Sequence, residues 1–284
     1  AGGVTWSLLE PAPVTSPSQY FPAEEGAASE FNGDVYAVGG FVQKRRLAIY
    51  QPSSDTWVDD GGLIPASRDR YHVALGVYAD DKLFTLGGTS SGPQRWVDVY
   101  DLSGGTWTSL TSMPMPTGGS GYDVVASAQI GDVVYGLFFS AGDGNTLFAY
   151  DMSTETTTEV AAKPRRRYAT MVTDGTYLYI LGGMLNPTTT GEPITDELWR
   201  YDPNTDTYLA LTPAPTPVQF HSAGIVDGKM YVVAVSDDNF DPMPDSWAYD
   251  LAAGTWETGL QQIPTLQHIA SEVVVGDTLY VLGG

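Results

Sequence analysis

The 284-residue sequence contains no cysteine, which excludes disulfide bonds, thiol catalysis and thiolate metal sites. Basic residues are also few, since 13 Lys and Arg stand against 34 Asp and Glu and the net charge is −21. Such a surface repels nucleic acid and anionic membranes, so we expect neither nucleic acid as a partner nor membrane insertion. No apolar run reaches the length of a membrane span. The acidic composition favours an extracellular or cell-surface location, with a cytoplasmic one as the alternative.

The sequence is rich in glycine, proline and tyrosine, which is typical of many short strands joined by turns. An aromatic residue on an apolar strand that ends in paired glycines, as in "DKLFTLGG" (81–88), recurs about every 50 residues. A second tyrosine follows in the first five repeats, and another aromatic residue or threonine comes seven residues after it. The three series are Tyr36, Phe84, Tyr135, Tyr179, Tyr231 and Tyr280; Tyr50, Tyr100, Tyr150, Tyr201 and Tyr249; and Trp57, Trp107, Thr157, Tyr208 and Trp256.

Each repeat contains four strand signals: an apolar stretch such as "YHVALGVY" (71–78), the diglycine strand, the tyrosine strand and the tryptophan strand. Paired glycines at a strand end allow neighbouring sheets to approach closely. Tyr and Trp rings fill the space between sheets, so we expect Trp57, Trp107 and Trp256 to be largely buried. The aspartate after each tyrosine is suited to cap the turn that follows. Four strands in about 50 residues is the period of a kelch propeller blade.

On these residues the sequence resembles the kelch-repeat family over nearly its whole length. The segments "YGLFFS" (135–140) and "YVVAVS" (231–236) lack the diglycine, so two of the repeats are degenerate. The resemblance implies one domain over 1–284 of the all-β class: a six-bladed kelch-type β-propeller with four-stranded antiparallel blades. The residues that carry it are Gly39, Gly40, Gly87, Gly88, Gly182, Gly183, Gly283 and Gly284, and the aspartates Asp101, Asp151, Asp202 and Asp250 after their tyrosines.

The sixth repeat has only its first two strands. Residues 4–9, "VTWSLL", look like an isolated tryptophan strand, and we expect them to join the C-terminal blade and close the ring. No tyrosine strand remains for that blade. Either residues 1–9 shift into its place, or the natural chain extends past these ends and further domains or a partner strand complete blade 6; we favour the second.

Ten of the thirteen basic residues fall in loops at one face of the expected ring, either between the second and third strands or leading into an inner strand. Loops on a rigid scaffold are common binding sites, and guanidinium groups suit carboxylates. We therefore predict that this face binds an acidic peptide or an anionic glycan. The alternative is structural, because the resemblance implies that an arginine before the inner strand often only contacts neighbouring loops. The predicted ligand-binding residues are Arg68, Arg70, Arg95, Arg165, Arg166, Arg167, Tyr71, Tyr168 and His221.

The sequence offers only weak metal candidates. Asp237, Asn239 and Asp241 alternate as in a calcium loop, but the glycine and distal glutamate of such a loop are missing, so we favour a solvated acidic loop. Three histidines lie near the starts of inner strands, where we expect structural roles. They are His72, His221 and His268.

No cofactor fingerprint occurs, and we expect no cofactor. Among kelch enzymes, the galactose-oxidase type needs a cysteine that this sequence lacks. A mutarotase-like enzyme acting on an anionic sugar stays open, as does a structural propeller module of a larger extracellular or assembled protein. The arginine-bearing face favours a binding module over both.

Overall fold

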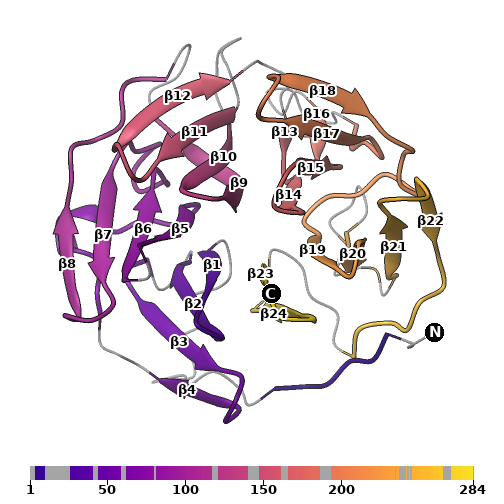
Figure 1. The fold of residues 1–284 in the computed structure, drawn as a ribbon, viewed down its shortest axis with the longest axis horizontal. Coiled ribbons are helices and arrows are strands. Elements are labelled where there is room, and N and C mark those ends of the chain that lie inside the picture. Colours follow the sequence, from indigo (N-terminus) through magenta and orange to yellow (C-terminus); the bar gives the residue numbers. More distant parts are fainter. Residues whose placement is uncertain are drawn as a thin grey trace.

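In the computed structural model of the chain, strands are grouped in sheets around a central axis (Figure 1). It describes residues 4–9, 26–40, 44–58, 62–79, 81–116, 121–139, 147–160, 166–185, 193–233, 235–236, 241, 243, 245–264 and 270–283. Apart from the single turn of 3-10 helix η1 (Ala66–Arg68), the elements within these ranges are strands. None of the described residues forms a helix long and apolar enough to cross a membrane.

Five sheets contain four antiparallel strands each, and in each the order in the sheet follows the order in the sequence. Blade 1 consists of β1 (Gly26–Phe31), β2 (Asp34–Gly39), β3 (Leu47–Gln51) and β4 (Thr56–Val58). Blade 2 consists of β5 (Ala74–Tyr78), β6 (Lys82–Leu86), β7 (Val97–Asp101) and β8 (Thr106–Ser109). Blade 3 consists of β9 (Asp123–Ile130), β10 (Val133–Phe139), β11 (Leu147–Asp151) and β12 (Thr156–Val160).

Blade 4 consists of β14 (Thr170–Thr173), β15 (Leu178–Leu181), β17 (Leu198–Asp202) and β18 (Thr207–Ala210). Blade 5 consists of β19 (Ser222–Val226), β20 (Lys229–Val233), β21 (Trp247–Asp250) and β22 (Thr255–Glu257). Two further sheets have two strands each: β13 (Arg166–Arg167) with β16 (Met184–Leu185), and β23 (Ser271–Val275) with β24 (Thr278–Leu282).

The prediction of six four-stranded blades was therefore wrong for the part of the chain that the structure describes, where five are formed and the sixth repeat gives the hairpin β23–β24. This hairpin lies between the innermost strands of blades 1 and 5 and contacts both (Figure 1). Ring closure by a strand at residues 4–9 is not confirmed, since these residues form no strand. They run along the outer rim, where Trp6 Nε1 donates a hydrogen bond to the carbonyl oxygen of Gln261 (2.9 Å).

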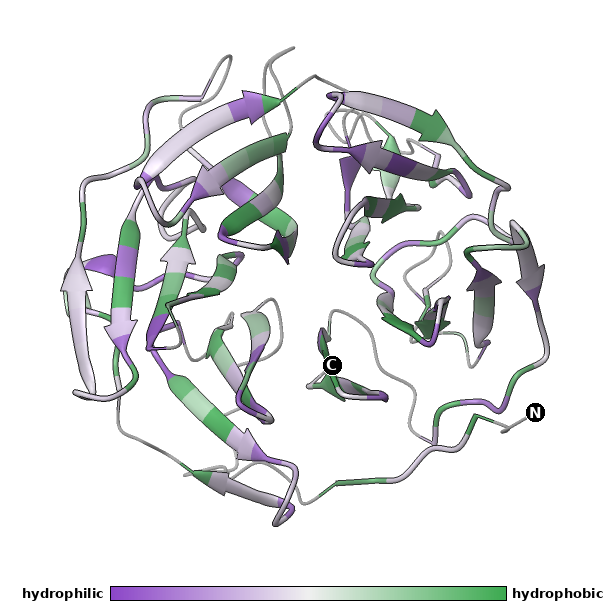
Figure 2. Cartoon of the chain, in the orientation of Figure 1, coloured by the Kyte–Doolittle hydropathy of each residue, from purple (hydrophilic) through white to green (hydrophobic). Residues whose placement is uncertain are grey.

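The hydrophobic core is divided into clusters that lie between neighbouring blades. For example, Tyr36 of blade 1 packs with Leu83 of blade 2, and Tyr135 of blade 3 packs with Met171 of blade 4. The fourth strands contribute little to these clusters, because their residues are exposed or only partly buried, and they are pale in Figure 2. Each blade is thus stabilised mainly by its neighbours, as expected for a repeat protein.

The tyrosine–aspartate motif has the structural role that its sequence predicts. Asp101 Oδ1 accepts hydrogen bonds from the backbone N–H groups of Gly104 (2.6 Å) and Ser103 (2.9 Å), which caps the turn between β7 and β8. These bonds hold the pKa of Asp101 below its usual value. The preceding tyrosine, Tyr100, is buried, but Trp107 on the fourth strand is only partly buried against it, with ring centroids 5.1 Å apart.

Trp57, Trp107 and Trp256 are each partly buried and pack against a core cluster, so they are less enclosed than the tyrosines beside them. The diglycine behaves as predicted. At Gly88, where φ is 99°, an added Cβ would lie 2.8 Å from the carbonyl oxygen of Tyr71. The missing side chain lets the loop that leads into the inner strand lie directly on the end of the second strand.

Candidate ligand-binding mouth

The loops that lead into the inner strands lie beside the loops between second and third strands, at one end of the ring. Backbone pairing of Tyr71 with Thr89, of Arg167 with Met184 and of Gln219 with Ser236 shows this in blades 2, 4 and 5. The predicted gathering of basic residues at one end is consistent with this topology. Eight of the ten are among the described residues: Lys44, Arg45, Arg46, Arg68, Arg70, Arg95, Arg166 and Arg167.

A cavity of about 120 Å³ lies on the axis of the ring. Its lining comes from the inner strands, or the residues just before them, of all five blades and of β23. The polar side chains in the lining are those of His72, Ser127, Tyr168, Thr170, His221, Ser271 and Glu272. The cavity is the place where the separate blades can act on one ligand.

Three bulky residues at equivalent positions border this cavity, and each has a positive φ: His72 (53°), Tyr168 (60°) and Phe220 (49°). The equivalence is visible in the backbone, because the N–H of Phe220 donates to the carbonyl oxygen of Tyr168 (3.1 Å), just as the N–H of Val124 donates to that of His72 (3.2 Å). The rings of Tyr168 and Phe220 stack with centroids 3.9 Å apart. Positive φ is uncommon for such residues and tends to occur at functional sites. We call these three residues the aromatic collar.

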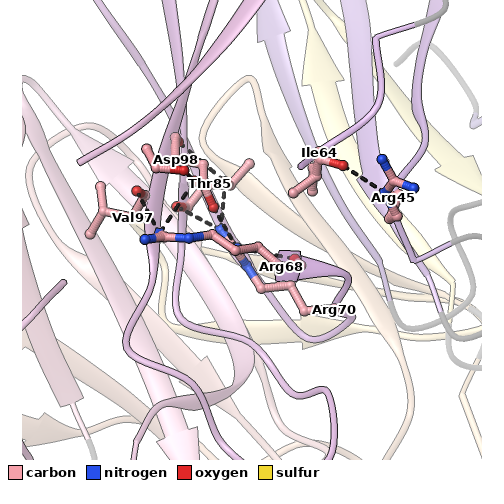
Figure 3. A network of polar contacts seen from close by, with 8 residues as sticks. Arg45, Ile64, Arg68, Arg70, Thr85, Val97 and Asp98 are labelled. Atoms are coloured by element: carbon pink, nitrogen blue, oxygen red, sulfur yellow. Dashed lines mark hydrogen bonds and ion pairs between the residues drawn. The ribbon is translucent and has the colours of Figure 1, made fainter. Parts of the chain in front are cut away.

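Arg70 is fully buried between strands of its own blade. Its guanidinium donates to Asp98 Oδ2 (2.6 Å) and, through the other terminal nitrogen, to the side chain and the carbonyl oxygen of Thr85 (2.8 and 3.2 Å). Arg68 lies beside Arg70 (Figure 3), and its Nη1 is 3.3 Å from Asp98 Oδ1. Arg45 takes no part in this network and donates a hydrogen bond to the carbonyl oxygen of Ile64. Burial lowers the pKa of Arg70 and the charge of Asp98 opposes this, so the arginine stays a cation.

Arg166 is also buried, and it forms an ion pair with Glu197 and donates to the carbonyl oxygen of Gly182 (2.7 Å). We therefore assign Arg70 and Arg166 a structural role, which is the alternative that the sequence left open. Arg95 donates to the carbonyl oxygen of Met113 (2.9 Å), again a contact between loops. Arg165 lies outside the described residues.

Three other basic residues lie over aromatic rings: Arg167, Lys44 and Arg68. The guanidinium of Arg167 lies over the ring of Tyr168, 4.7 Å from its centroid, and so joins the aromatic collar. Lys44 lies over the ring of Tyr71 (5.3 Å), and the side chain of Arg68 is 21% exposed. Ligand contact remains a prediction for these residues and for Tyr71 and Tyr168.

Two histidines of the lining have opposite surroundings. His72 Nδ1 lies 2.7 Å from Asp123 Oδ1, which also accepts a hydrogen bond from Thr89 Oγ1 (2.7 Å). Burial alone would raise the pKa of Asp123, but these bonds hold it below its usual value. His221 is buried, and neither ring nitrogen has a hydrogen-bond partner among the described residues. Burial lowers its pKa to about 3, so the ring is neutral.

Sequence reasoning missed Phe220, Asp123 and Glu272. Burial raises the pKa of Glu272, on β23, to about 8. Counting back from the start of each inner strand would have aligned Phe220 with Tyr168, but nothing in the sequence indicates that Asp123 faces a histidine 51 residues away. The metal candidates Asp237 and Asn239 lie outside the described residues, so Asp241 alone can be placed and the calcium question stays untested.

The sequence profile of the family described as Attractin/LZTR1 beta-propeller matches residues 35–284. The chain belongs to this kelch-type β-propeller family. It is 31% identical over 312 residues to Kelch-like protein terF of Aspergillus terreus, covering 98% of this chain and 64% of that protein.

Two other relatives match most of this chain at lower identity. The chain is 22% identical over 274 residues to Kelch-like protein 35 of Mus musculus, covering 94% of this chain and 42% of the relative. It is 24% identical over 258 residues to Alpha-scruin of Limulus polyphemus, covering 84% and 27%. The chain thus spans less than two thirds of the length of each of these relatives.

Proposed function

We propose that this propeller is a protein-interaction module whose cavity mouth binds an acidic peptide, or the similar carboxylates of an anionic glycan. The observation that carries the proposal is the aromatic collar, with Arg167 over Tyr168 at the edge of the axial cavity. Kelch-type relatives give the general class, and the ligand chemistry comes from the residues of the mouth.

The collar offers two kinds of contact. The stacked rings of Tyr168 and Phe220 form a flat apolar wall on which a peptide side chain or a sugar ring can rest. The guanidinium of Arg167 offers hydrogen bonds to a carboxylate beside that wall. Because the net charge of the chain is −21, long-range attraction cannot recruit an anion. Affinity therefore has to come from short-range contacts, and mutations should alter the dissociation rate more than the association rate.

The test is a screen of acidic peptides and anionic glycans, followed by titration of each binder against variants. Arg167→Ala should weaken binding about tenfold or more, since a charged hydrogen bond contributes about 1.5–3 kcal/mol. Phe220→Ala removes one ring of the stacked wall and should weaken binding by a similar factor, since an aromatic contact contributes about 0.5–1.5 kcal/mol beyond its buried area. Arg200→Ala is the matched control. It also removes one positive charge, but Arg200 lies in β17 with its guanidinium over Tyr177, outside the cavity lining.

The control should bind like the parent protein. If no anionic ligand binds, or if Arg167→Ala and Phe220→Ala bind as tightly as Arg200→Ala, the mouth is not the site.

One observation favours a second candidate, an enzyme that acts on an anionic sugar. His72, which is paired with Asp123, and Glu272 both line the cavity. Burial raises the pKa of Glu272 to about 8, so its carboxyl group can donate a proton near neutral pH, and the imidazole of His72 is a group that can accept one. The check is NMR exchange spectroscopy of uronic and sialic acids with the protein. Acceleration of anomer exchange that His72→Gln abolishes would establish the enzyme, and exchange at the buffer rate would exclude this activity for those sugars.

A further inference from the structure

Glu272 puts a carboxyl group at a position that the complete blades fill with uncharged side chains. Like its equivalents, it directly precedes the inner-strand residue that pairs with the second-strand aromatic residue. The equivalents are Ala28, Leu75, Ser127, Met171 and Ala223. Leu75 and Met171 are buried in the clusters between blades. The carboxyl group of Glu272 is likewise held away from bulk water, which disfavours a lone negative charge.

No positive side chain balances this carboxyl group. The strands that pack against β23 are β1, β2, β19 and β24, and none of the four contains a lysine or an arginine. The titratable residues on these strands and on the turn before β24 are Glu30, Asp34, Tyr36, Tyr280 and Asp277. Of the thirteen basic residues only Lys163 and Arg165 lie outside the described ones, in the loop before β13.

The same cavity is lined by a second polar side chain whose hydrogen bonds are not made. His221 is 4% exposed, and neither of its ring nitrogens has a partner among the described residues. Because the ring is neutral, one of the two nitrogens is an acceptor. Buried polar groups are normally paired, so Glu272 and His221 together favour a ligand that donates hydrogen bonds and carries a positive charge.

We propose that the axial cavity is a binding site for a primary ammonium group, such as the end of a lysine side chain. An ammonium group has three donors and no acceptor, which matches a carboxylate and an imidazole nitrogen. The rings of Tyr168 and Phe220 border the cavity and offer faces that attract a cation, and the net charge of −21 raises the local concentration of cations.

The strand register also favours a long side chain. Tyr168 of the aromatic collar lies three residues before Met171, the equivalent of Glu272, so Glu272 is about 10 Å further along the inner strands than the collar. The flexible four-carbon stem of lysine suits such a depth. The site does not depend on the acidic ligand proposed above, because Arg167 has no part in it.

The probe is n-butylammonium chloride, which has the four-carbon stem of lysine and no carboxylate, titrated into the full chain by calorimetry. We expect saturable binding that strengthens about tenfold from pH 7 to pH 9, because Glu272 has to lose its proton to pair with the ammonium group. Comparison of two buffers with different heats of ionisation at pH 7 should show release of about one proton. The uncharged 1-butanol should not bind.

On the protein, Glu272→Gln should weaken binding about tenfold or more and abolish the proton release, since it removes a buried charge partner. His221→Phe keeps a ring but loses the acceptor nitrogen, and should weaken binding about fivefold, as expected for one hydrogen bond. Glu257→Gln is the matched control. It also removes one negative charge, but the Glu257 side chain is 55% exposed and outside the cavity lining, so this variant should bind like the parent protein.

The proposal is overturned if butylammonium does not bind at pH 9, or if Glu272→Gln binds it as tightly as Glu257→Gln. It is also overturned if sodium chloride at the same concentration displaces the probe, because the cavity would then be a metal-ion site. Failure of the acidic peptides and glycans at the mouth would not alter any of these outcomes, since the probe carries no carboxylate.

Discussion

Arg70→Met offers the sharpest test of the structural role assigned to the arginines. The substitution keeps an apolar stem of similar length but removes the guanidinium that bonds to Asp98 and Thr85. Asp98 is completely buried, so its charge cannot be hydrated after the change. In the variant the Asp98 carboxylate keeps two other partners, Arg68 Nη1 at 3.3 Å and the hydroxyl of Ser109 at 2.6 Å.

The magnitude follows from this geometry. Removing one partner of a buried ion pair costs about 3–5 kcal/mol, and the remaining partners place Arg70→Met near the lower value, about 3 kcal/mol. Arg166→Met is the matched comparison, because Arg166 is equally buried but its partner Glu197 is 43% exposed. Water can solvate that carboxylate, so we expect a smaller loss of about 1–2 kcal/mol.

Urea unfolding of the two variants and the parent measures both values. A double variant, Arg70→Met with Asp98→Leu, removes both charges and should be more stable than the sum of the single changes predicts. If Arg70→Met costs less than about 1 kcal/mol, or no more than Arg166→Met, then Arg70 does not hold blade 2 together. Its guanidinium would then again be a candidate for ligand contact.

Three further changes test other parts of the fold. Tyr100→Ala should cost about 3–5 kcal/mol in urea unfolding, and Trp107→Ala clearly less, because only the tyrosine is fully enclosed. Gly88→Ala should destabilise the fold by about 2 kcal/mol or more, because the added Cβ clashes with the backbone and φ is positive. Gly131→Ala also has a positive φ, but its Cβ would lie in open space, so it should cost about 1 kcal/mol. Since the fold raises the pKa of Glu272 from 4.5 to about 8, the folded state keeps a proton that the unfolded chain loses, and the contribution of Glu272 to stability falls as the pH rises through this range. Buried His221, whose pKa falls from 6.5 to about 3, contributes the opposite slope up to about pH 6.5, so a net fall is expected between about pH 6.5 and 8. Glu272→Gln should remove this slope in thermal melts and leave stability near pH 4 unchanged; a slope that persists in the variant would point to another group.

The blades could be predicted from the sequence because each is a local unit. The four strands of a blade follow one another along the chain, and the tyrosine, aspartate and glycines act within a few residues of their own positions. Asp101 illustrates this, since its turn-capping partners are two and three residues away.

The partners of the arginines could not be predicted in this way. Arg70 and Asp98 are 28 residues apart, and Arg166 and Glu197 are 31 apart, in loops and third strands whose lengths differ between repeats. From the sequence, an arginine on a loop is therefore expected to be exposed, whereas Arg70 and Arg166 are buried and bind groups of their own blades. The contact between Trp6 and Gln261 spans 255 residues and is the extreme case. It fixes Trp6 at the rim beside the segment that follows the fourth strand of blade 5, and no spacing within a repeat specifies such a contact.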